Sequence, residues 1–160
     1  MKHLRLLCFL LCLTAFGQGS IINGKDLPEY EIEGAGTATQ GNYLVRTTVL
    51  TKNKKISDKE IARAAVHGVL FRGFSDSSNR ISQKPLAGNA ANEAQHIDFY
   101  SAFFDEKGSA ANYASVLNGS RTIIKVDKKY KISAIVTVNK ELLHKYLEEA
   151  GIIKGLNSIF

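Results

Sequence analysis

The chain has 160 residues, with 21 Lys or Arg, 15 Asp or Glu and two Cys, so that its formal net charge is +6. Both cysteines, Cys8 and Cys12, lie near the start of the chain, and the remainder therefore has no disulfide framework, thiol nucleophile or thiolate metal site. The length suffices for one domain with one core, which we expect residues 29–160 to form.

Residues 1–17 have the layout of a secretory signal peptide. Basic residues precede an apolar run over residues 6–13, and small residues follow up to Gly17. The run is shorter than the roughly 20 apolar residues that span a bilayer. We therefore expect cleavage near Gly17/Gln18, a periplasmic or secreted protein, and a flexible lead-in over residues 18–28.

Two strands are expected next. Residues 29–34 alternate apolar and charged side chains, with Tyr30 and Ile32 on one face, and this period of two indicates a half-buried strand. Residues 43–51 are rich in β-branched and aromatic side chains and predict a longer strand. The Gly-Ala-Gly segment at 34–36 is not a dinucleotide fingerprint, because the third glycine is missing and a strand follows.

Ser57 and Glu60 have the spacing of a capping box, which predicts that a helix begins at Asp58. Apolar residues recur at helical spacing up to about Arg72 and give this helix one apolar face. Gly68 inside the helix costs about 1 kcal/mol relative to alanine. Such a residue is expected where another backbone approaches closely.

Residues 74–92 are rich in Ser, Asn and Gly and predict a long loop; loops of this length are usually functional or disordered. A helical pattern over residues 91–106 follows, with four aromatic side chains from Phe99 to Phe104. These rings cannot all point one way on a helix, so some are expected to meet another surface. Residues 113–117 are expected to form one further helical turn.

Residues 121–126 and 130–138 are expected to form a β-hairpin, since the second segment alternates apolar and polar side chains. Asn139 is a suitable N-cap for a last helix over residues 140–150. Together these elements predict an α+β fold. Its antiparallel sheet has about four strands in two strand–strand–helix halves, with helices on one face and a helical insert.

Two histidines are candidates for acid–base chemistry and leave a hydrolase open as one alternative. His67 follows Arg63 by one helical turn, and His96 lies two residues before Asp98. No Gly-x-Ser-x-Gly motif presents a serine nucleophile. Helix positions two apart point in different directions, so His96 and Asp98 do not predict a metal site. We therefore assign no catalytic residue, no metal and no cofactor.

The aromatic residues beside the long loop favour a protein-binding surface and a non-enzymatic role, with an unidentified protein of the cell envelope as partner. The partner-binding residues expected from this pattern are Phe74, Arg80, Lys84, Pro85, Phe99, Phe103 and Phe104. For the aromatic side chains themselves, packing in the core is the default interpretation and an interaction patch is the alternative.

Lysines cluster in two turns, over residues 52–55 and 125–131. Nucleic-acid binding usually needs a denser basic face with interleaved aromatic residues, and we do not expect it here. Solvated turns explain most such clusters. A binder of anionic envelope polysaccharide or lipid is the alternative that the charge leaves open.

Residues 64–74, 96–104 and 150–160 resemble an uncharacterised family of small secreted proteins of Gram-negative bacteria, and the likeness covers nearly the whole mature chain. This resemblance assigns no catalytic residues. The hairpin at 129–138 with its following helix is similar, more distantly, to periplasmic lipoprotein domains associated with outer-membrane or flagellar assembly. Neither cysteine lies in a lipobox, so membrane association is expected only through a partner.

Overall fold

The computed structural model describes residues 27–76, 81–88 and 90–154. The expected signal peptide, nearly all of the lead-in and Arg80 lie outside these residues. Within them the chain combines helices with an antiparallel sheet, and the predicted α+β class is confirmed.

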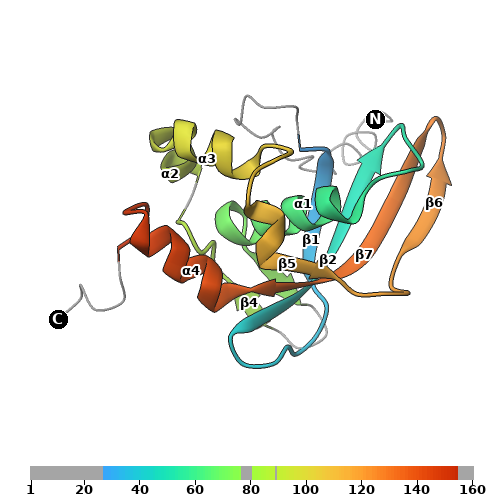
Figure 1. The fold of residues 1–160 in the computed structure, drawn as a ribbon. Coiled ribbons are helices and arrows are strands. Elements are labelled where there is room, and N and C mark those ends of the chain that lie inside the picture. Colours follow the sequence, from blue (N-terminus) through green and yellow to red (C-terminus); the bar gives the residue numbers. More distant parts are fainter. Residues whose placement is uncertain (1–26, 77–80, 89, 155–160) are drawn as a thin grey trace, which may run out of the picture.

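The main sheet has five strands, one more than predicted (Figure 1). Strands β1 (Glu29–Gly34), β2 (Asn42–Thr51) and β7 (Lys129–Asn139) lie side by side in that order. The far side of β7 carries two short strands, β6 (Thr122–Val126) along its first half and β5 (Ala114–Val116) along its second half. Every pair in the sheet is antiparallel.

Alternation along the strands separates an apolar face of the sheet from a charged one. The apolar face includes the buried side chains of Tyr30, Val45, Val49, Ile132, Val136 and Val138. On the opposite face, ion pairs cross the strands from Arg46 to Glu33 at 3.0 Å and from Lys129 to Glu29 at 3.5 Å. This second face is therefore in contact with water.

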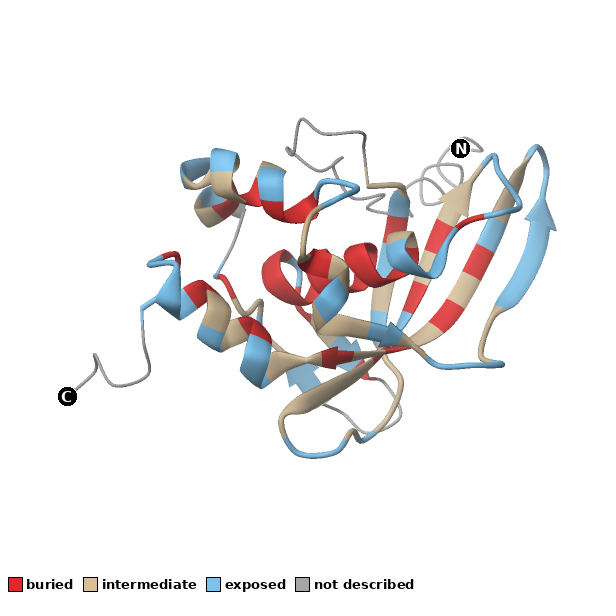
Figure 2. Ribbon diagram, viewed as in Figure 1, coloured by how far each residue is buried: buried red, intermediate tan, exposed pale blue. Residues whose placement is uncertain are grey.

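Helix α1 (Asp58–Phe71) packs on the apolar face and forms the centre of the core (Figure 2). All residues from Ile61 to Phe71 are buried, so this helix has neighbours on every side and not on one face alone. The predicted capping box is present. The Ser57 hydroxyl accepts the Glu60 N–H at 3.2 Å, and the Glu60 carboxylate accepts the Ser57 N–H at 2.9 Å.

Gly68 allows α1 to pack closely against β1. A Cβ atom at this position would lie 2.8 Å from Cδ1 and 2.9 Å from Cγ2 of Ile32, closer than carbon atoms pack in protein cores. The expected close approach is thus present, but the neighbour is the side chain of Ile32 and not a backbone segment.

The segment after α1 differs from the predicted loop. Strands β3 (Phe74–Asp76) and β4 (Ile81–Gln83) form a small antiparallel sheet of their own. Three-residue strands are too short to show an alternating pattern in the sequence, which is why the composition predicted a loop.

The expected helix over residues 91–106 is two helices, α2 (Ala90–Gln95) and α3 (Ile97–Phe104), because the backbone leaves helical geometry at His96 (φ −116°, ψ 34°). The Arg63 guanidinium on α1 donates a hydrogen bond to the Phe104 carbonyl at 2.9 Å and links α1 to the end of α3. The break at His96 therefore lets α3 take its own direction against the core.

A short 3₁₀ helix (Ala110–Tyr113) leads directly into β5, where the sequence predicted a helical turn over residues 113–117. The last elements follow the prediction closely. A two-residue turn at Asp127 and Lys128 joins β6 to β7. Asn139 then caps α4 (Lys140–Glu149) by accepting the Leu142 N–H at 2.9 Å.

Candidate functional site

The partner-binding residues expected on α3 belong mainly to the core. The side chains of Phe103 and Phe104 are each 3% exposed, so neither is available to a partner on the surface. Phe99 is half-buried, and its ring lies 5.9 Å from the Phe103 ring and 5.9 Å from the Tyr146 ring on α4. The crowding of aromatic residues is therefore explained by packing between α1, α3 and α4.

The expected residues around β3 and β4 lie elsewhere on the molecule. In Figure 1 the β3–β4 sheet and α3 are on opposite sides of α1, so the structure does not join the two groups into one surface. Phe74 is half-buried against Tyr43, with ring centroids 5.2 Å apart. Lys84 is exposed and Pro85 is half-buried.

A hydrogen-bonded chain of polar side chains crosses the core from β1 to α1 and α2. The Tyr30 hydroxyl lies 2.5 Å from Nδ1 of His67, and Nε2 of His67 lies 3.1 Å from Oε1 of Glu93. Tyr30 is 5% exposed and the other two residues are 3% exposed. The rings of Phe71 and Phe104 lie 4.9 and 5.2 Å from the imidazole. This chain of groups is enclosed by apolar side chains.

The donor and acceptor roles in this chain of groups depend on which imidazole nitrogen carries the proton, because a protonated ring nitrogen donates, an unprotonated one accepts and a hydroxyl can do either. Burial raises the pKa of the Tyr30 hydroxyl above its usual value of 10.0, while the nearby Arg72 guanidinium acts in the opposite direction. Arg72 lies over the Tyr30 ring at 4.1 Å and donates to the Tyr30 carbonyl at 2.8 Å.

This geometry does not favour catalysis by His67. Both imidazole nitrogens are engaged inside the core, and a general base needs one nitrogen within hydrogen-bond reach of its substrate. His96 is half-buried at the start of α3, and its side chain makes no capping hydrogen bond. No group of three or more His, Cys, Asp or Glu in the described part of the chain is arranged to hold a metal ion.

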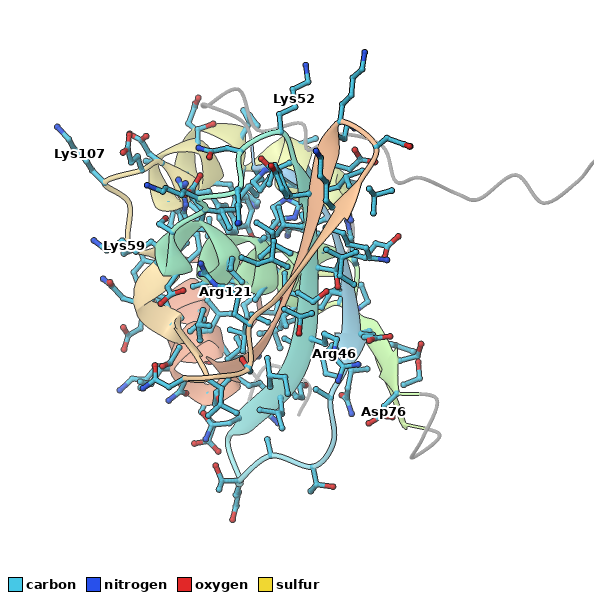
Figure 3. All side chains as sticks on the ribbon, turned by 90° about the vertical axis from the view of Figure 1, so that its right-hand side faces the viewer. Arg46, Lys52, Lys59, Asp76, Lys107 and Arg121 are labelled. Carbon is cyan, nitrogen blue, oxygen red and sulfur yellow. The ribbon has the colours of Figure 1, made fainter. Side chains whose placement is uncertain are left out.

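The two lysine-rich turns meet at one end of the sheet. Thr51, at the end of β2, is paired with Tyr130 on β7, so the turns that follow β2 and precede β7 are neighbours. Figure 3 shows Lys52 at the same end as the tip of the β6–β7 hairpin. We call this region the basic end, and its residues are Lys52, Lys54, Lys55, Lys125, Lys128, Lys129 and Lys131.

Strand β6 is the most exposed strand of the main sheet. All five of its residues are exposed, and they include three large apolar ones: Ile123 at 40%, Ile124 at 54% and Val126 at 44%. Among the described residues, β6 pairs only with β7, so its other edge is open to solvent. Apolar side chains next to an open edge are typical of a strand that binds another chain.

Sequence reasoning placed β6 correctly but did not predict its exposure. The apolar pair at Ile123 and Ile124 was a usable signal, because neighbouring strand residues point to opposite faces and only one face of this sheet is covered. The pairing of β5 and β6 along the same side of β7, which leaves β6 at the margin, could not be derived from local pattern.

Comparisons of this chain with protein-family models, with curated proteins and with solved structures found no match. In the part of the chain that the structure describes, none of the helices has both the length and the apolar character needed to cross a bilayer.

Proposed function

We propose that this protein is a non-enzymatic binding module of the cell envelope, periplasmic or secreted, that contacts a protein partner through strand β6. The observation that carries the proposal is the exposure of Ile123, Ile124 and Val126 beside an open strand edge. Isolated apolar side chains are common on protein surfaces, but three of them on the two faces of one strand with an open edge favour aggregation unless a partner covers them.

The layout of the N-terminal residues supports the location, because a charged start, a short apolar run and small residues are the parts of a secretory signal. The resemblance proposed from the sequence, to small secreted proteins of Gram-negative bacteria, would imply the same location. Because Phe103 and Phe104 are buried, we place the proposed contact surface on β6 and not on α3.

Crosslinking in intact cells, followed by purification of the mature protein, tests this function. Ile123→Thr with Ile124→Thr should reduce recovery of the crosslinked partner at least about tenfold, since anchor residues carry most of the energy of an interface. Leu142→Thr on α4 is a matched control, because Leu142 is 56% exposed and lies away from β6. The control should leave recovery unchanged.

Two results would contradict the proposal. Equal recovery from the β6 variant and from the control shows that β6 is not the contact surface. If Phe74→Ala or Phe99→Ala loses the crosslinked partner while the β6 variant still recovers it, the contact surface is the one expected from the sequence.

The basic end supports a second candidate function, the binding of anionic polysaccharide or lipid. Its lysines come from two separate turns that the fold brings together. Lys129 and Lys131 are paired with Glu29 and Glu31, and the other lysines of the basic end are exposed and can attract an anionic surface. Binding to vesicles of phosphatidylglycerol and phosphatidylcholine should then weaken steeply with salt and with Lys52→Gln, Lys54→Gln and Lys55→Gln combined. Binding that persists at high salt would exclude this candidate.

A further inference from the structure

The open edge of β6 specifies the chemistry of the partner. We propose that β6 binds an extended segment of another protein by strand addition, and that this segment carries an acidic residue among apolar ones. The inference rests on the proposed binding function and adds the chemical class of the partner to it.

The backbone of β6 is arranged for an added strand. The two-residue turn makes Val126 and Lys129 the closing pair of the hairpin, and such a pair exchanges hydrogen bonds. Alternate residues of an antiparallel strand direct their N–H and C=O groups to opposite sides. Ile123 and Lys125 therefore direct theirs away from β7, where the described part of the chain has no other strand.

The side chains of β6 specify which residues fit opposite them. Ile123 and Lys125 are on the face that α1 covers further along the sheet, because they pair with Ile132 and Tyr130. Ile124 is on the open face. Residues directly opposite each other in paired strands contact through their side chains. These contacts are completed by apolar residues of the partner opposite Ile123 and Ile124 and by an acidic residue opposite Lys125.

Charge favours an acidic segment over a second copy of this chain. Lys125 and Lys128 are exposed, and neither makes an ion pair with another described residue. Asp127 is the only acidic residue of the hairpin. A second copy would bring further lysines to this edge, whereas an acidic segment supplies the missing opposite charge.

A synthetic peptide tests the inference directly. The probe is a labelled peptide with the core Val-Glu-Val-Val-Thr, which places its Glu opposite Lys125 in the antiparallel register. Lys125→Pro removes a backbone N–H that faces the peptide, and Lys125→Gln removes the charge but keeps that N–H. Binding should weaken about threefold in Lys125→Gln and at least about tenfold more in Lys125→Pro.

Amide hydrogen exchange gives a second readout in the unmodified protein, and it holds even where Lys125→Pro impairs folding. The peptide should slow exchange at Ile123 and Lys125 at least about tenfold, because their N–H groups enter hydrogen bonds. Exchange at Leu142, which is far from β6, should not change.

Several outcomes would overturn the inference. Equal affinities of Lys125→Pro and Lys125→Gln exclude strand addition, and equal binding of a peptide with Lys in place of Glu excludes the acidic partner. Self-association that Lys125→Pro abolishes, without peptide binding, identifies a second copy as the occupant. If the peptide does not bind but recovery of the crosslinked partner in cells still depends on Ile124, this inference is overturned and the proposed function stands.

Discussion

At the scale of single residues, the buried groups Tyr30, His67 and Glu93 are the most unusual feature of the core. Polar groups in an apolar interior are stable only when they are hydrogen-bonded to one another. Each of these side chains comes from a different element, so the network links β1, α1 and α2. We interpret it as a structural connection and not as a catalytic site.

Removal of the imidazole should therefore destabilise the fold strongly. His67→Ala leaves a cavity and removes one hydrogen bond each from Tyr30 and Glu93, and we expect the free energy of unfolding to fall by about 3 kcal/mol. Urea denaturation measures this change. His144→Ala is the control, because His144 is half-buried and not enclosed in the core, with Glu148 3.7 Å away, and it should cost less than about 1 kcal/mol. Similar losses in the two variants would contradict the structural role.

Burial of Tyr30 also predicts how stability depends on pH. The pKa of its hydroxyl is raised in the folded protein, so the folded state holds the proton more tightly than the unfolded chain does. The contribution of this group to the free energy of unfolding is complete below the unfolded pKa of 10.0 and is lost as the pH rises above it. In unfolding curves above pH 10, the wild type should lose stability more steeply than Tyr30→Phe. Identical slopes would show that Tyr30 does not titrate as described.

At the scale of secondary-structure elements, the contact of α1 with β1 explains why a glycine is placed inside a helix. Gly68→Ala should gain about 1 kcal/mol of helix propensity but lose more than that through its clash with Ile32. We expect a net loss of about 1 kcal/mol in the wild type. In an Ile32→Ala background the same substitution should stabilise the protein, and thermal or urea unfolding of the four proteins measures the coupling. Additive effects of the two substitutions would contradict the close contact.

Elements with strong local signals were predictable from the sequence. The capping box at Ser57 and Glu60 placed the start of α1, and Asn139 placed the start of α4. The short strands β3, β4 and β5 were missed, because three residues carry no recognisable period and their pairing is set by tertiary contacts.

The candidate site was less predictable than the elements. His67 was singled out, but Tyr30 lies 37 residues before it and Glu93 26 residues after it, and no local pattern connects them. For the aromatic residues of α3 the sequence left both core packing, the default, and an interaction surface open, because burial of Phe103 and Phe104 depends on how α3 packs against the rest of the fold.

At the scale of the whole molecule, exposed apolar side chains and lysines are concentrated at one margin of the sheet. One face of the sheet is closed by α1, whereas the margin formed by β6 is apolar, exposed and next to the basic end. The two features lie on the same hairpin, with the isoleucines on β6 and lysines at its tip. A partner with apolar and acidic residues would contact both at once, and this arrangement is the basis of the proposed function.

Site-specific photo-crosslinking in intact cells tests this account most directly. A photo-reactive residue is placed at Ile124 in one protein and at Leu142, an equally exposed apolar position on α4, in another. If β6 is the binding surface, position 124 yields a discrete crosslinked protein and position 142 yields none. Crosslinks from position 142 alone, or from neither position, would contradict the claim that β6 is the binding surface.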